Sequence, residues 1–376
     1  MEKIIEQYIN ENYEPMLQTL RELCRIPAPS HHEDARAAYC KAWLENAGAQ
    51  GVVIDEAKNV VFGINYENSN SITAIAAHTD TVFPDLEPMP MHEDEEKIHC
   101  PGVGDDTASV VVLMTLAKFF IEHRIAPKNG ILFVCNSCEE GLGNLKGTRQ
   151  LFKDYAGRIG QFITFDSEPD ILNDRCVGSH RYKVEAITEG GHSYFAFGKA
   201  NAIAALAGVV RDIYSLDVPQ KAGSRTSYNV GTIEGGTSVN TIAQHAEMLC
   251  EYRSDDVECL QMMQTAFEAI FASANSDKVE LKITRVGDRP CGNVDEKAQT
   301  AFVERVTDVI EPIIGKTLTF TSSSTDCNIP LSLGVPAVCI GVNASAGAHT
   351  REEWVNKASL RMGLEIAIKT ALEVTK

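Results

Sequence analysis

The first part of the chain alternates between apolar runs with the spacing of strands and segments with the spacing of helices. Helical patterns cover residues 2–24, 32–47, 107–123 and 146–155, and strand patterns cover 52–56, 59–64, 71–77, 130–135 and 161–165. The segment 107–123 is apolar around most of its circumference, so we expect it to be buried. This alternation predicts an α/β fold with a mixed, mostly parallel sheet flanked by helices.

The pattern changes after residue 178. Strand, helix, strand, strand, helix and strand patterns follow at 180–188, 199–216, 226–236, 246–254, 257–274 and 278–286. This order is typical of a ferredoxin-like α+β unit, a small sheet with two helices on one face. Residues 287–293 look like an exit linker, after which helix, strand and helix patterns return at 295–314, 336–341 and 356–374. We therefore predict a catalytic domain of residues 1–178 and 289–376, interrupted by a lid and dimerisation domain of residues 179–288.

Composition narrows the possible partners. The chain has 34 basic and 52 acidic residues among 376, and the acidic residues are spread along its length. Nucleic acids and anionic membranes require basic patches, so we expect neither as a partner. The segment 2–20 has no signal-peptide pattern and no run approaches the length of a membrane span, which predicts a cytoplasmic protein.

The eleven cysteines show no disulfide-framework spacing and are expected to be reduced thiols. Cys135 and Cys138 have the CxxC spacing of a metal knuckle or a redox site. No second CxxC completes a four-thiolate site, and the pair follows a strand without the helix start that a thioredoxin motif requires. We interpret this pair as structural.

Histidines and carboxylates gather where predicted strands end or a helix begins. The candidates are His78 and Asp80 after strand 71–77, Asp105 and Asp106 at the start of helix 107–123, Glu139 and Glu140 after strand 130–135, Asp166 and Glu168 after strand 161–165, and His349 after strand 336–341. Ligand sites of open α/β sheets lie at such strand ends. Buried carboxylates repel one another at a cost of several kcal/mol, so a shared cation is the simplest explanation. Two histidines and three carboxylates suffice for two ions if one carboxylate bridges them.

The order of these motifs resembles that of a known enzyme family. "HTD" at 78–80, "GDD" at 104–106, "EEG" at 139–141, a strand-ending acid and "AHT" at 348–350 resemble the two-zinc metallopeptidases that include peptidase T, carboxypeptidase G, aminoacylases and succinyl-diaminopimelate desuccinylases. The resemblance covers nearly the whole chain. It implies a zinc-dependent hydrolase that cleaves an amide bond of a small peptide, a di- or tripeptide, as an amino- or carboxypeptidase. The alternatives are an N-acyl amino acid deacylase of the same family and, less favoured, an inactive binding protein.

The resemblance also implies the cofactor and the roles of individual residues. Two zinc ions per chain are expected, with cobalt or manganese as possible substitutes. The implied metal ligands are His78, Asp105, Glu140, Asp166 and His349, with Asp105 as the bridge. Asp80 is implied to orient the imidazole of His78, and Glu139 to act as the general base. Asp166 is favoured over Glu168 because it is the first residue out of the strand.

In the predicted lid, three residues match substrate-binding positions of the family: His192 in "GGHS", Asn240 in "GGTSVNTIA" and Arg253 in "EYRSDD". His192 is implied to stabilise the oxyanion, across the interface of a homodimer formed through the lid. Without such a role, the three residues would be a turn histidine, an asparagine before a strand and a surface arginine.

Two further features concern the segment after "GDD". Thr107 and Ala108 stand where the family commonly has a lysine, which leaves the ligands intact but puts the transfer of substrate preference in doubt. The resemblance also implies a cis peptide bond between Asp105 and Asp106, in which Asp106 is not a ligand.

Overall fold

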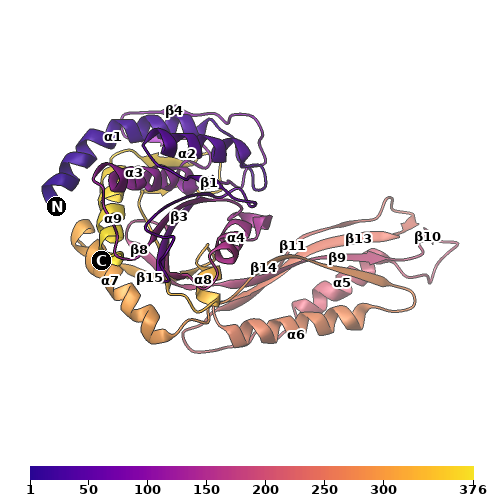
Figure 1. Cartoon of the computed structure of the whole chain (residues 1–376). Helices are drawn as coiled ribbons and strands as arrows, with labels where there is room; N and C mark the ends of the chain where they lie inside the picture. The colour runs from indigo at the N-terminus through magenta and orange to yellow at the C-terminus, as the bar shows by residue number, and fades with distance from the viewer. The chain divides into compact units, whose positions relative to one another are not determined.

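The computed structural model describes residues 1–376, and the chain divides into two compact units. Unit 1 comprises Met1–Cys176 and Asn293–Lys376, and unit 2 comprises Val177–Gly292 (Figure 1). The lid predicted from the sequence, 179–288, falls within unit 2. None of the helices combines the length and the apolar character that a membrane span requires.

A mixed eight-stranded sheet forms the centre of unit 1, in the order β1-β2-β6-β3-β7-β16-β8-β15. The strands are β1 (Val53–Ile54), β2 (Val60–Ile64), β3 (Ile72–His78), β6 (Ile131–Asn136), β7 (Ile159–Thr164), β8 (Ile171–Cys176), β15 (Thr319–Ser323) and β16 (Ala337–Ile340). Four pairs of neighbouring strands are parallel: β6–β3, β3–β7, β7–β16 and β8–β15. The pairs β1–β2, β2–β6 and β16–β8 are antiparallel. The predicted mixed, mostly parallel sheet is confirmed.

Helices lie on both faces of this sheet. They are α1 (Glu2–Cys24), α2 (Asp34–Asn46), α3 (Ala108–Glu122), α4 (Lys146–Asp154), α7 (Glu296–Ile314), α8 (Asn328–Ser332) and α9 (Ser359–Val374). Strand β3 sends Ile75 and Ala77 into one core with α1, α3 and α9, and Ala74 and Ala76 into a second core that contains residues of α4 and α8. This alternation is that of a strand buried on both faces. Helix α3 is buried along most of its length, as its apolar circumference predicts.

The sequence patterns missed strands β8 and β15, which lie together on one side of the sheet. Their sequences, "ILNDRC" and "TFTSS", mix polar and apolar residues without a continuous apolar run, because both strands are only partly buried. A second, smaller sheet of unit 1 was also not predicted. It contains β4 (His92–Glu93), β5 (Lys97–His99), β17 (Ser345–Ala346) and β18 (Trp354–Asn356).

Unit 2 has the predicted order of strands and helices, with two additional short strands that were not predicted. Its elements are β9 (Gly178–Ile187), β10 (Gly191–His192), α5 (Ala202–Ile213), β11 (Thr226–Gly235), β12 (Thr241–Ile242), β13 (His245–Ser254), α6 (Val257–Ala274) and β14 (Glu280–Arg289). Strands β11, β13, β9 and β14 form an antiparallel sheet in that order, and both helices contribute to one core with it. The linker predicted at 287–293 begins too early, because β14 continues to Arg289. Gly287, the first residue of the predicted linker, lies at a β-bulge.

Candidate metal centre

His78 ends strand β3, and its ring is fully buried. Its Nδ1 lies 3.0 Å from the backbone oxygen of Asp80, and its Nε2 lies 3.0 Å from Oδ1 of Asp105. When Nδ1–H donates to this carbonyl, the lone pair of the neutral ring is at Nε2, which suits a metal ligand. The carboxylate of Asp80 is farther from Nδ1, at 3.5 Å. The carbonyl of Asp80 therefore orients the ring more directly than its carboxylate does.

The carboxylate of Asp80 has other partners. Its Oδ1 accepts the backbone N–H of Glu139 at 2.9 Å, and its Oδ2 accepts the N–H of Glu140 at 3.0 Å. The hydroxyl of Ser30 also donates to Oδ2, at 2.7 Å. Asp80 thus joins the end of β3 to the turn after β6.

Asp105 presents one carboxylate oxygen to each of two histidines. Its Oδ1 lies 3.0 Å from Nε2 of His78, and its Oδ2 lies 3.1 Å from Nε2 of His349. Burial opposes ionisation of Asp105, but the contacts with His349 and His78 outweigh burial and lower its pKa. A carboxylate that stays ionised and faces two imidazoles has the arrangement of a bridging ligand.

The backbone around Asp105 is held by a carboxylate that the sequence did not single out. Asp105 lies in the short segment η1 (Val103–Thr107), directly before α3, and its own backbone angles are not helical, with φ of -112° and ψ of 90°. The backbone N–H groups of Gly102, Gly104 and Asp105 donate to Glu353 over 2.6, 2.8 and 2.9 Å. Glu353 is buried, and burial raises its pKa to about 7. Glu353 therefore positions the segment that carries the proposed bridge.

Asp106 has a different role from its neighbour. The peptide bond between Asp105 and Asp106 is cis, as the resemblance implied. The carboxylate of Asp106 accepts the backbone N–H of His78 at 3.0 Å. This hydrogen bond fixes the backbone at the end of β3, so the side chain of Asp106 serves the backbone of the site.

Glu140 and His349 meet beside Asp105. Nε2 of His349 lies 3.2 Å from Oε1 of Glu140, yet this buried oxygen has no hydrogen-bond partner. Burial raises the pKa of Glu140 to about 7, whereas the contacts with Asp105 and Glu140 raise the pKa of His349 to about 10. His349 lies in the loop between β17 and β18 and has a left-handed backbone, with φ of 64°. An unsatisfied buried oxygen among several carboxylates is a position that a cation would satisfy.

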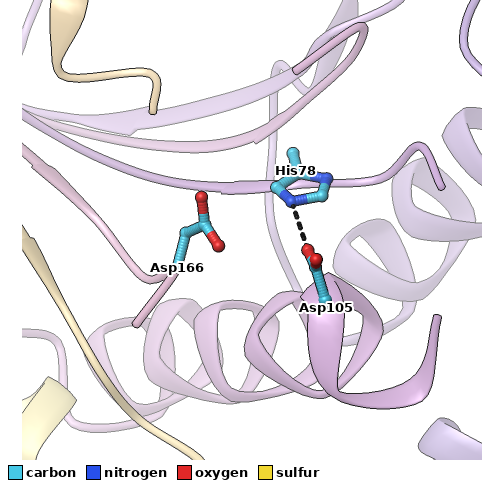
Figure 2. A group of neighbouring side chains, drawn as sticks. All are labelled: His78, Asp105 and Asp166. Atoms are coloured by element: carbon cyan, nitrogen blue, oxygen red, sulfur yellow. Dashed lines mark hydrogen bonds and ion pairs between the residues drawn. The ribbon is translucent and has the colours of Figure 1, made fainter. Parts of the chain in front are cut away.

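Asp166 follows β7 and forms a group with His78 and Asp105. Their ligand atoms all lie within 4.8 Å of one another, and Figure 2 shows both carboxylates beside the imidazole ring. Asp105, Glu140 and His349 form a second group with the same spacing. Burial, followed by the charge of Asp105, raises the pKa of Asp166 well above its ordinary value.

The two groups share Asp105, so the structure brings together all five residues that the resemblance implied as ligands. Glu168, the alternative to Asp166, belongs to neither group. It is half-buried, and burial raises its pKa. The geometry therefore favours Asp166 over Glu168.

Glu139, the implied general base, is buried and belongs to a third close group with His78 and Glu140. Another buried carboxylate lies near it. Burial, with the charge of Glu139 as the next cause, raises the pKa of Asp326 to about 7. Asp326 accepts hydrogen bonds from Asn136, over 2.6 Å, and from Thr148.

Sequence reasoning also missed Arg36, whose side chain is fully buried. Its Nε donates to the carbonyl of Ile26 at 2.7 Å. Its Nη1 donates to the carbonyl of Thr79 at 2.9 Å and to the hydroxyl of Thr107 at 3.0 Å. Arg36 thus links α2, the end of β3 and η1. Nothing in its sequence context distinguishes it from a surface arginine.

In unit 2, His192 and Asn240 lie close together. Strand β10 pairs with β12 so that His192 faces Thr241, and Ser193 donates to the carbonyl of Asn240 at 2.9 Å. The N–H of Tyr194 lies 3.2 Å from Nδ1 of His192, which leaves Nε2 to carry the proton of the neutral ring.

Arg253 lies near the opposite end of β13, where its residue pair in β9 is Ser179. Its guanidinium donates to both oxygens of Glu251, at 2.8 and 3.1 Å. The structure of unit 2 therefore does not bring Arg253 together with the other two predicted residues.

Comparison with known proteins gives a consistent picture. Residues 74–373 match the model of the peptidase family M20/M25/M40. The chain is 24% identical over 356 residues to a Mycobacterium tuberculosis protein named as the succinyl-diaminopimelate desuccinylase DapE, covering 92% of this chain and 94% of that one. It resembles the structure of a Staphylococcus aureus tripeptidase, with a TM-score of 0.75, 21% identity and coverage of 96% and 99%. It also resembles Bacillus subtilis YXEP, described as a dinuclear metal-binding peptidase, with a TM-score of 0.66, 17% identity and coverage of 98% and 100%.

Proposed function

Because the chain belongs to the peptidase family M20/M25/M40, as its motifs suggested, and is a hydrolase, we propose that it cleaves an amide bond of a small peptide at a two-cation centre. The proposed ligands are His78, Asp105, Glu140, Asp166 and His349. The observation that carries this proposal is the pair of contacts that Asp105 makes, with one oxygen toward each of two histidines. His78 is grouped with Asp166, and His349 with Glu140. Each cation would therefore have one histidine and one carboxylate of its own, and Asp105 would be a ligand of both cations.

The residues present fit divalent cations. The buried Oε1 of Glu140 has no hydrogen-bond partner, and burial raises the pKa of both Glu140 and Asp166. Carboxylates crowded in this way gain most from a positive charge between them. Zinc is the proposed ion because imidazole and carboxylate ligands suit it, and cobalt or manganese are the proposed substitutes. When bound, two such cations supply Lewis-acid chemistry that polarises the scissile carbonyl and lowers the pKa of water.

Glu139 is proposed as the general base. It takes the proton from the attacking water and returns it to the nitrogen of the leaving amine. The hydrogen bond from its N–H to Asp80 fixes its backbone, which supports a defined position for the carboxylate. His192 is proposed to donate from Nε2 to the carbonyl oxygen as this oxygen becomes negative.

Three proposals about substrate contacts and assembly come from the family resemblance. Asn240 lies beside His192 in unit 2, which supports a shared role in binding the substrate. Arg253 is proposed to bind a substrate carboxylate, and it would have to exchange its present partner, Glu251, to do so. A homodimer through unit 2 is proposed as the assembly in which His192 acts.

The substrate class separates two candidate activities. Similarity to the tripeptidase supports di- and tripeptides, whereas similarity to DapE supports N-acyl amino acids. We propose peptides first. The test is a panel of di- and tripeptides with free or blocked ends, together with N-acyl amino acids, assayed with two equivalents of zinc. Turnover confined to the N-acyl compounds would replace the peptidase proposal with the deacylase.

The adjacent glutamates provide the test of the mechanism. Glu139→Gln should reduce turnover by at least about 100-fold while two cations remain bound, because it removes the base and retains the ligands. Glu140→Gln should lose one cation. Metal analysis and peptide hydrolysis on both variants measure this difference, and an equal loss of metal in the two variants would show that the roles are misassigned.

A further inference from the structure

The turn that carries Glu139 is held in an unusual way. Each backbone N–H of residues 137–140 donates to a side-chain acceptor. The pairs are Ser137 with Asn59 Oδ1 at 3.1 Å, Cys138 with Glu33 Oε1 at 3.2 Å, Glu139 with Asp80 Oδ1 at 2.9 Å, and Glu140 with Asp80 Oδ2 at 3.0 Å. Three side chains from other segments thus define the path of this turn.

Glu33, directly before α2, is the least expected of these acceptors. Its side chain is fully buried. Its Oε1 accepts the N–H of His31 at 2.8 Å and, from Cys138, both the N–H at 3.2 Å and the thiol at 3.1 Å. Its Oε2 lies 3.7 Å from Nζ of Lys58, which also donates to the carbonyl of His31. Glu33 is therefore the common partner of three residues from three segments.

These three residues share a disfavoured backbone conformation. His31, Lys58 and Cys138 have φ values of 74°, 76° and 56°, in the left-handed region that residues with a Cβ avoid. Such conformations persist where surrounding contacts hold them, and they gather at functional sites. The carboxylate of Glu33 supplies contacts to all three.

We propose that Glu33 is a positioning residue for catalysis. It holds Cys138 in its left-handed conformation and thereby directs the side chain of the next residue, Glu139, toward the metal centre. Asp80 fixes the N–H of Glu139 itself, and Glu33 fixes the residue before it, so the peptide plane between them is defined from both sides. This inference rests on the proposed role of Glu139 as the general base.

The first test compares two substitutions of Glu33 in the zinc-loaded protein. Glu33→Ala removes the acceptor, whereas Glu33→Gln retains an oxygen that can accept the same N–H groups. We expect Glu33→Ala to lower kcat by about 10- to 100-fold, since a misplacement of about 1 Å can cost that much. KM should change by less than about threefold, two cations should remain bound, and Glu33→Gln should retain most of kcat.

Asp34→Asn is the matched control. Asp34 is exposed, is adjacent in sequence, and pairs with the same Lys58 at 2.6 Å. It has no contact with Cys138, so its substitution should leave kcat unchanged. A similar loss of kcat in Asp34→Asn would assign the effect to Lys58 instead of Glu33.

The second test acts on Cys138 and remains decisive if Glu33→Ala does not fold. Cys138→Gly keeps the amide and accepts a positive φ, so kcat should stay within about threefold of the parent. Cys138→Val has a β-branched side chain that opposes this conformation, and it should lower kcat by at least about tenfold. Combining Cys138→Gly with Glu33→Ala should recover a large part of the loss, because glycine no longer needs the support.

The outcomes separate this inference from the proposed function. Equal kcat for Cys138→Gly and Cys138→Val, or parental kcat in Glu33→Ala, would overturn the role of Glu33. Loss of bound metal in Glu33→Ala would also overturn it, because Glu33 would then support the ligands and not the base. If Glu139→Gln keeps its turnover, the proposed general base is wrong, whatever the Glu33 variants show.

Discussion

Replacing Glu353 with alanine should loosen the segment that presents Asp105. The substitution removes the acceptor of three backbone N–H groups, at 2.6, 2.8 and 2.9 Å, in a buried position. A buried amide that loses its acceptor costs about 1–3 kcal/mol, so the gross loss is about 3–9 kcal/mol. Water that enters the space left by the side chain would bring the loss toward the lower figure.

An opposing contribution comes from the charge of Glu353. Burial raises its pKa from 4.5 to about 7, and each pKa step of one is worth about 1.4 kcal/mol. Above pH 7 the buried carboxylate therefore costs the folded state about 3 kcal/mol, which the substitution relieves. The net decrease in the free energy of unfolding is then about 0–6 kcal/mol, centred on about 3 kcal/mol.

Urea unfolding of the metal-free protein at pH 7.5 would measure this decrease, and calorimetric titration with zinc would measure the accompanying loss of affinity. The exposed neighbour provides the control, because Glu352→Ala should change stability by less than about 0.5 kcal/mol. The pH dependence gives a second check. The parent should lose stability as the pH rises from 4.5 to 7 through ionisation of Glu353, and the variant should lack this component. Unchanged stability together with unchanged zinc affinity in Glu353→Ala would refute the reasoning.

Three other predictions follow from buried groups. Asp166→Asn should release one of two bound cations, whereas Glu168→Gln should release none, as metal analysis would show. Burial lowers the pKa of His180 from 6.5 to about 4, so the unfolded chain binds more protons than the folded chain between these pH values. The free energy of unfolding of unit 2 should therefore fall by up to about 3 kcal/mol as the pH falls from 6.5 to 4. In urea unfolding measured at several pH values, His180→Asn should reduce this dependence on pH. Arg36→Met should destabilise the protein by about 2–4 kcal/mol in a thermal or urea assay, because it leaves the buried carbonyl of Thr79 and the partly buried carbonyl of Ile26 without donors.

The sequence predicted the five residues whose side chains the structure brings together at the proposed centre. Glu140 and His349 could be identified because each belongs to a short motif at a strand end or in a loop after a strand. Glu353 and Glu33 could not, because they act on backbone amides far away in sequence and carry no motif. Glu353, for example, contacts an amide 248 positions earlier, within a stretch, "REEW", that reads as a solvated charge run. A single sequence records which side chains are present, but not which distant amides need an acceptor.

The same distinction applies to the fold. Strands such as β3 and β6 were predictable because they are buried on both faces and therefore consist mostly of apolar residues. Strands β8 and β15 were not, because each has a partly exposed face that tolerates polar residues. In unit 2, alternation of buried and exposed residues along β9 and β13 marked the strands clearly.

The position of β16 in the sheet has a consequence for the order in which the protein is made. β16 lies between β7 and β8, although it follows them by more than 150 residues, and the sheet partners of β8 are β16 and β15. A growing chain therefore contains the whole of unit 2 before β8 has any sheet partner in unit 1. His349 emerges later still, after β16. On the ribosome, unit 2 should fold first, and the proposed cation-binding centre should be completed only after His349 has emerged.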